Sequence, residues 1–192
     1  MQTSFDLDPQ SAVVSRIAAG VRDDQLTGPT PCADLPVAAV LHHLVTLTSA
    51  FRGAAEQEPQ GPGPMPEASE LPADWRERLP RQLDALAAAW RNPTAWEGTT
   101  EIAGMPLPGP TIAVVALNEV LVHGWDVAAA TGQDYEADDA SAQVCLDFAL
   151  EIAANAPEMR NAMYAPAVPV PDDAPLLDRL IGQTGRDPRW SA

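Results

Sequence analysis

The residues with the clearest chemical potential are an acid and an imidazole, Glu119 and His123, in the stretch LNEVLVHGWDVAAATGQ (residues 117–133). Side chains with this spacing are neighbours on a helix surface, with Cβ atoms roughly 5–6 Å apart. A carboxylate oxygen and a ring nitrogen can therefore converge on one point. Such a pair can bind a divalent metal ion, or it can form a hydrogen-bonded Glu–His pair without a metal.

The surrounding apolar residues place this pair on an interior face. At helical spacing, Glu119 and His123 share their face with four apolar residues: Ile112, Ala116, Val120 and Val127. A carboxylate in an apolar interior costs many kcal/mol unless a partner satisfies it. Three explanations stay open from the spacing alone: a metal site, a buried polar pair, or an amphipathic helix whose polar edge is misplaced.

A third metal ligand is available from a second predicted helix, at about residues 35–55. The chain has three histidines, and the other two, His42 and His43, are adjacent on this helix. The spacing of the apolar residues on this helix does not decide which of the two imidazole rings points toward the interior. We therefore expect one ring to face inward and the other to lie at the rim, or both to be ordinary solvated or core histidines.

Asp126 lies on nearly the same face as Glu119, and Trp125 precedes it. The Asp126 carboxylate either is an outer partner, which orients a metal-binding imidazole through a hydrogen bond without binding the metal itself, or is a surface charge. The tryptophan either lines a pocket or belongs to the core. Arg186 and Arg189, near the C-terminus, either grip a substrate carboxylate or belong to a solvated tail.

The two cysteines, Cys32 and Cys145, are too few for a disulfide framework. Cys32 precedes the histidine-bearing helix and is expected to be a structural buried thiol rather than a functional one. Cys145 lies among apolar residues and is expected to be inert.

Length and charge limit the function classes. The 192 residues suit one domain, expected to span residues 1–192. A net charge of −16 argues against nucleic acid and against anionic membranes, because both bind to a basic surface. No apolar run is long enough to span a membrane, and no secretory signal is visible. A cytoplasmic location is therefore expected.

Periodicity predicts helices near residues 9–22, 35–55, 74–91, 109–130, 137–154 and 176–183. Asp8 is the expected cap of the first helix. The third helix begins either at Asp74 with a kink or near Pro80. Residues 95–107 predict a short β-hairpin or an extended excursion. The expected fold is an all-α bundle at about residues 8–156, followed by a proline-rich tail with a short helix at about 157–192.

Four stretches resemble the actinobacterial mycothiol-dependent maleylpyruvate isomerase metal-binding domain family, in its single-domain branch. They are VRDDQLTGPTPCAD (21–34), LHHLV (41–45), NEVLVHGWDVAAATGQ (118–133) and LDRLIGQTGRDPRW (177–190). The resemblance implies a DinB-like up-down four-helix bundle with an extra C-terminal helix. The chain departs from the family at Leu35, where a tryptophan is usual. The resemblance to the single-domain branch implies that the second, C-terminal domain of the isomerases is not expected.

Carried over by position, the resemblance implies that His43, Glu119 and His123 bind a divalent metal, with His42 as a neighbour. Zinc is expected first, with nickel, iron or manganese as alternatives. The implied function is a metal-dependent thiol S-transferase or isomerase-like enzyme, with mycothiol as the co-substrate and an electrophile as the substrate. The alternatives are a non-catalytic metal-binding sensor or interaction module, and a metal-free bundle. A homodimer is an oligomeric state that the sequence allows.

Overall fold

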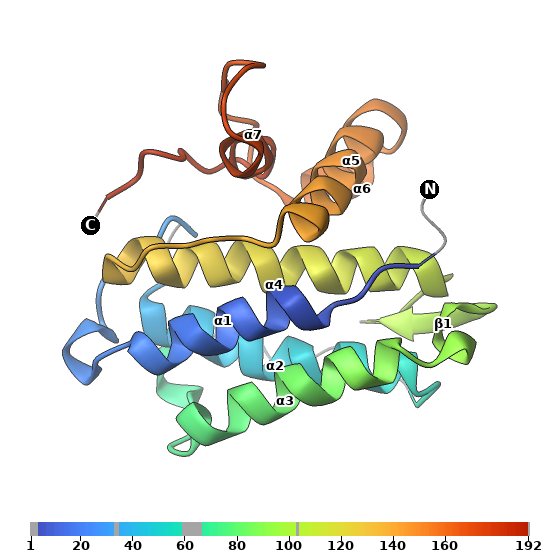
Figure 1. Cartoon of the computed structure of the whole chain (residues 1–192), viewed down its shortest axis with the longest axis horizontal. Helices are drawn as coiled ribbons and strands as arrows, with labels where there is room; N and C mark the ends of the chain where they lie inside the picture. The colour runs from blue at the N-terminus through green and yellow to red at the C-terminus, as the bar shows by residue number, and fades with distance from the viewer. Residues whose placement is uncertain (1–3, 33–34, 59–66, 103, 192) are drawn as a thin grey trace.

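The computed structural model describes residues 4–32, 35–58, 67–102 and 104–191 (Figure 1). These residues form mainly α-helices, with one antiparallel pair of strands, β1 and β2. The prediction of an all-α fold with a short hairpin is therefore confirmed. The helices are α1 (Asp8–Gly20), α2 (Val37–Ala55), α3 (Trp75–Trp90), α4 (Gly109–Thr131), α5 (Asp139–Asn155), α6 (Pro157–Met163) and α7 (Leu176–Gln183).

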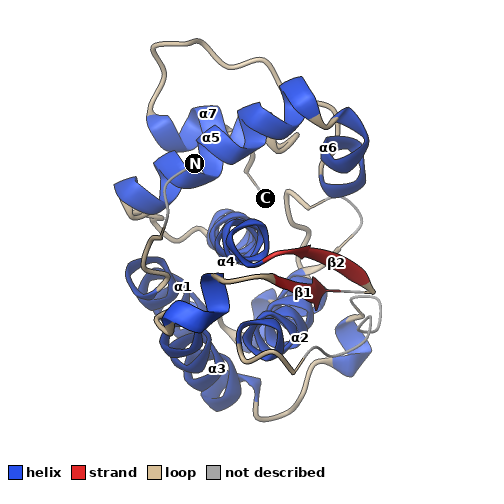
Figure 2. Cartoon of the chain, turned by 90° about the vertical axis from the view of Figure 1, so that its right-hand side faces the viewer, coloured by secondary structure: helices blue, strands red, loops and turns tan. Residues whose placement is uncertain are grey.

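The first four helices form the bundle. Helices α1 and α2 each pack against both α3 and α4. The other side of α4 packs against α5, which in turn carries α6 and α7. Figure 2 shows α4 end-on, with the other three bundle helices on one side and this C-terminal layer on the other. Because α4 has neighbours on opposite sides, its polar side chains can meet groups from both halves of the chain.

Helix α4 is the most apolar long helix among the described residues. By length and composition alone it could cross a membrane, but 89% of its most apolar window is buried inside the protein. It ends where Gly132 adopts a left-handed conformation with φ of 67°. This conformation costs a glycine little, which explains why the Thr131-Gly132 pair terminates the helix as expected.

The ends of α1 and α3 refine the sequence predictions. Asp8 is the first residue of α1 and not its cap; the Asp6 carboxylate accepts a hydrogen bond from the Asp8 backbone N–H at 3.0 Å. Helix α3 begins at Trp75 and continues through Pro80. Proline removes one helical hydrogen bond. The buried residues of α3 nevertheless follow one face on both sides of it: Trp75, Leu79, Leu83, Leu86, Ala87 and Trp90. This packing keeps the helix continuous.

The hairpin joins α3 to α4. Strand β1 (Thr99–Ile102) pairs antiparallel with β2 (Met105–Pro108), with Thr99 opposite Pro108 and Ile102 opposite Met105. Gly104, with φ of 80°, lies in the turn between the strands. Both strands contact α4, so the hairpin closes one end of the bundle.

The C-terminal layer contains more helix than the sequence predicted. Helix α5 begins at Asp139, where the Asp138 carboxylate accepts hydrogen bonds from the backbone N–H and hydroxyl of Ser141, both at 2.8 Å. Helix α7 has the predicted bounds. Helix α6 was not predicted, because none of its seven residues is buried and its apolar pattern is correspondingly weak.

Candidate metal centre

The structure brings His43, Glu119 and His123 together between α2 and α4. One nitrogen or oxygen atom from each lies within 4.8 Å of the others. Oε2 of Glu119 is 3.2 Å from Nε2 of His123 and 3.4 Å from Nε2 of His43. The two imidazole rings meet edge to face, with centroids 4.8 Å apart. Of the three explanations for Glu119 and His123, the misplaced polar edge is therefore excluded.

Helix packing accounts for this convergence. Helices α2 and α4 lie side by side, so His43 reaches across to the face of α4 that carries Glu119 and His123. Gly124 lets the bundle close behind this face. A Cβ atom on it would lie 2.5 Å from Cγ2 of Val14 on α1 and 2.8 Å from the hydroxyl of Tyr135. A larger residue beside His123 would therefore push α1 away.

The cluster is open at one end and closed at the other. The exposed fraction of the side chain is 29% for His43 and 21% for Glu119. It falls to 11% for His123 and to zero for Asp126, which lies behind it. A small ligand can therefore approach the three side chains from the His43 side, whereas the opposite side is sealed by protein.

The side chains shift one another's ionisation. Burial by itself would raise the pKa of Glu119, but hydrogen bonds with His123 and His43 hold this pKa far below its usual range. Burial by itself would lower the pKa of His123, but hydrogen bonds with Asp126 and Glu119 raise it to about 9. Without a metal, the cluster therefore holds a carboxylate against a protonated imidazole.

Behind His123, Asp126 and Arg186 form a fully engaged ion pair. Nδ1 of His123 lies 2.9 Å from Oδ2 of Asp126. The Arg186 guanidinium donates from Nε to Oδ1 at 2.7 Å and from Nη2 to Oδ2 at 2.8 Å. Burial opposes ionisation of Asp126, but His123 and Arg186 lower its pKa. An ionised carboxylate only accepts hydrogen bonds, so Nδ1 of His123 carries a proton and Nε2 faces the cluster.

Asp126 is thus an outer partner of the candidate centre, one of the two roles expected for it. Arg186 differs from its expected roles: its guanidinium is neither solvated nor free to grip a substrate carboxylate. The sequence feature that singled out Arg186 is the TGRDP stretch, which lies in the C-terminal segment that resembles the family. Spacing could not reveal the contact, because Arg186 and Asp126 are 60 positions apart in the chain.

His42, Trp125 and Arg189 do not contribute a side chain to the three-residue cluster. His42 is buried, and its Nδ1 accepts a hydrogen bond from the backbone N–H of Glu67 at 3.2 Å. It therefore binds Glu67, the residue directly before η2 (Ala68–Glu70), instead of the cluster. Trp125 is buried on α4. Arg189 is 89% exposed and pairs with Asp187.

Cys32 lies closer to the centre than the sequence suggested. Its Sγ, a ring nitrogen of His123 and a carboxylate oxygen of Asp126 lie within 4.8 Å of one another. Burial raises the pKa of the Cys32 thiol to about 11, with a further rise from the Asp126 charge that Arg186 partly offsets. Cys145 is fully buried, which raises its pKa strongly. Neither thiol is an activated nucleophile in this state.

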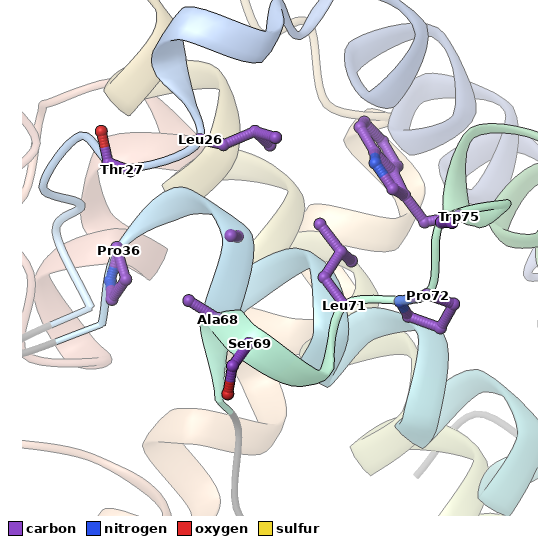
Figure 3. Close-up of a pocket in the computed structure, with 10 residues that line it drawn as sticks. Leu26, Thr27, Pro36, Ala68, Ser69, Leu71, Pro72 and Trp75 are labelled. Atoms are coloured by element: carbon purple, nitrogen blue, oxygen red, sulfur yellow. The ribbon is translucent and has the colours of Figure 1, made fainter.

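A separate pocket, with a volume of about 570 Å³, lies beside the start of α2 (Figure 3). It lies between the start of α2, the η2–α3 segment and residues Leu26 and Thr27. Its described lining is mostly apolar, with the hydroxyls of Thr27 and Ser69 and no imidazole or carboxylate side chain. This pocket therefore does not form part of the candidate metal centre.

The residues of the cluster fit a divalent cation. Two imidazole nitrogens and one carboxylate oxygen form a donor set that zinc, iron, nickel and manganese accept. The hydrogen bond from Nδ1 of His123 to a carboxylate is the arrangement that orients histidine ligands in metal sites. The described residues also leave the His43 side accessible, as an open ligand position requires.

Comparison with known proteins agrees with the resemblance found in the sequence. The model of the mycothiol maleylpyruvate isomerase N-terminal domain matches residues 7–128. This match covers α1 to α3 and most of α4, including His43, Glu119, His123 and Asp126.

Two uncharacterized proteins of Mycobacterium tuberculosis, from strains CDC 1551 and H37Rv, are each 26% identical to this chain over 178 residues. Each alignment covers 90% of this chain and 91% of the relative. No solved structure matches the chain significantly. The family match spans more than half of the described chain and contains the whole three-residue cluster, and the chain belongs to the mycothiol maleylpyruvate isomerase N-terminal domain family.

Proposed function

We propose that this protein binds one divalent metal ion through Nε2 of His43, a carboxylate oxygen of Glu119 and Nε2 of His123. We further propose that it uses the metal to present mycothiol to an electrophilic substrate, as a thiol S-transferase or isomerase-like enzyme. The observation that carries the proposal is the convergence of three donor atoms from two helices within 4.8 Å. Zinc is the first choice of metal, with nickel, iron or manganese as alternatives.

Each residue of the cluster has a defined task. The Glu119 carboxylate remains ionised and supplies a negative charge, because its pKa is held far below the usual range. Asp126 accepts a hydrogen bond from the Nδ1–H of His123 and thereby directs Nε2 of that ring toward Glu119. His43 stands at the accessible side of the cluster. A small thiol would therefore approach the cluster from the His43 side.

A divalent cation held by His43, Glu119 and His123 would lower the pKa of a coordinated thiol and so would make a thiolate available near neutral pH. The protein keeps water away on the other side, where Asp126 has no exposed surface and His123 very little. Mycothiol is proposed because of the family. A cytoplasmic location is proposed because low-molecular-weight thiols are kept reduced there.

The first test is metal content. We expect the protein, purified without chelator, to hold about one divalent ion per chain by elemental analysis, as a single three-ligand site implies. Glu119→Ala should abolish metal uptake, whereas the neighbouring variant His42→Ala should retain it. Protein that contains no metal and takes up no added zinc would overturn the proposal.

The second test separates an enzyme from a metal-binding module. Mycothiol should bind the metal-loaded protein and not the chelator-treated protein. Binding should release about one proton near neutral pH, because a free thiol of pKa about 8.5 is mostly protonated there. Calorimetry in buffers of different ionisation heat counts this proton, and consumption of an added electrophile should exceed that with thiol alone. Equal thiol binding with and without metal would favour the non-catalytic module.

A further inference from the structure

Arg186 follows the end of α7 after Thr184 and Gly185, outside the residues that the family model matches. Its guanidinium makes two parallel hydrogen bonds to the Asp126 carboxylate, at 2.7 and 2.8 Å, and Nη1 donates to the Thr184 carbonyl at 3.2 Å. The arginine side chain is only 10% exposed and Asp126 is fully buried. A two-pronged contact of this kind defines the orientation of a carboxylate as well as neutralising it.

Asp126 transmits this contact to the cluster. Its Oδ2 accepts hydrogen bonds from both Nη2 of Arg186 and Nδ1 of His123, at 2.8 and 2.9 Å. A buried carboxylate that lost Arg186 would have one partner and a large desolvation cost. Without the two-pronged contact it would be free to rotate, and rotation would disturb its hydrogen bond with His123.

The C-terminal layer determines where Arg186 lies. Gly185 has φ of 83°, and a Cβ atom there would come within 2.6 Å of the Ala165 carbonyl oxygen. The Arg186 backbone N–H donates to the Ile181 carbonyl at 3.2 Å. Helix α7, which carries this turn, packs against α5, and α5 packs against α4. The guanidinium therefore reaches Asp126 only when this layer is docked.

We propose that Arg186 is a positioning residue of the metal centre, acting through Asp126 on His123. The C-terminal layer thereby contributes to metal affinity although it supplies no ligand. This inference rests on the proposed function, because it requires His43, Glu119 and His123 to bind a divalent ion. It goes beyond that function by assigning a role to a residue outside the matched domain.

The experiment measures the affinity of the full chain for Zn²⁺ by competition with a chromophoric chelator, and the visible spectrum of the Co²⁺ form. We expect Arg186→Gln to weaken Zn²⁺ binding about 10- to 100-fold, the range typical of lost outer partners. Its Co²⁺ spectrum should change, since His123 is reoriented. Arg186→Lys should weaken binding less, because lysine keeps the charge but not the two-pronged geometry.

Arg189 provides the matched control, since it belongs to the same segment and is 89% exposed. Arg189→Gln should bind Zn²⁺ as the wild type does. Asp126→Asn should weaken binding as Arg186→Gln does, and the double variant should be no weaker than Asp126→Asn alone. Affinities are compared well below the melting temperature of each variant, so a purely structural role of Arg186 would lower Tm and leave Zn²⁺ affinity unchanged.

The outcomes separate the two proposals. Wild-type protein that binds no Zn²⁺ would overturn the proposed function and this inference together. Tight wild-type binding with unchanged affinity in Arg186→Gln would overturn only the role of Arg186. If Arg186→Gln does not fold, the Zn²⁺ affinity of Arg186→Lys is compared with that of the control variant Arg189→Lys. Weaker binding by Arg186→Lys supports the role of Arg186, and equal binding overturns it.

Discussion

The Nδ1 atom of His123 lies 2.9 Å from Oδ2 of the fully buried Asp126. This hydrogen bond determines which ring nitrogen is left for the candidate metal centre. Nε2 of the same ring lies 3.2 Å from the Glu119 carboxylate, so one imidazole stands between two acids. The metal-free and metal-loaded proteins should consequently respond to pH in opposite ways.

For the metal-free protein, the pKa of His123 rises from 6.5 to about 9 on folding. Because the folded-state pKa is the higher one, the stabilisation is complete below about pH 6.5 and is lost as pH rises through about 9. We expect the free energy of unfolding in urea and chelator to fall across this interval, and His123→Gln to flatten the dependence. A stability that increases over the same interval would contradict the assignment.

Zn²⁺ binding should show the reverse trend. The His123 ring must lose its proton before Nε2 can donate a lone pair, so affinity should rise with pH up to about 9, the pKa of this ring. Calorimetric titration at several pH values measures this dependence. A Zn²⁺ affinity that is flat between pH 6.5 and 9 would show that His123 is not a ligand.

Substitution of the two adjacent histidines should have clearly different effects on Zn²⁺ affinity. His43 lies 3.4 Å from Glu119, whereas His42 accepts a hydrogen bond from the backbone N–H of Glu67. His43→Ala should therefore weaken Zn²⁺ binding more than about 100-fold, beyond the loss expected for an outer partner. His42→Ala should change affinity by a few-fold at most. The opposite ranking would place the wrong histidine at the centre.

Gly124 should resist substitution for reasons of space. In Gly124→Ala the added methyl would meet Cγ2 of Val14 and the hydroxyl of Tyr135. We expect a loss of about 1–3 kcal/mol in the free energy of unfolding, as is typical of overpacked cores. The double variant with Val14→Ala should lose less than the sum of the two single changes. Strict additivity in urea unfolding would mean that the two residues do not clash.

Thiol labelling should distinguish the partly buried Cys32 and the buried Cys145 from an ordinary thiol. Burial and the Asp126 charge raise the pKa of Cys32 from 9.0 to about 11. Near pH 8 its thiolate fraction is then about a hundredfold below that of an ordinary thiol, which slows alkylation in proportion. Cys145, fully buried, should react only on unfolding. Mass spectrometry of iodoacetamide-treated protein measures both rates. Labelling of Cys32 as fast as free cysteine would contradict this account.

Several features could be determined from the sequence because their causes are local. Apolar periodicity identified the long helices, and the Thr131-Gly132 pair marked the end of α4. The same periodicity placed Glu119 and His123 on one interior face, since residues one helical turn apart share a direction wherever the helix packs. The hairpin followed from turn residues between short β-forming stretches.

The tertiary structure alone decided the relationships between distant segments. Helical angles did not separate His42 from His43; the packing of α2 against α4 brought His43 to Glu119. Packing also kept α3 continuous through Pro80, because its buried face extends on both sides. Arg186 meets Asp126 across 60 positions only because the C-terminal layer docks on α4. Contacts of this kind depend on how layers stack, and layer stacking leaves no periodic trace in either segment.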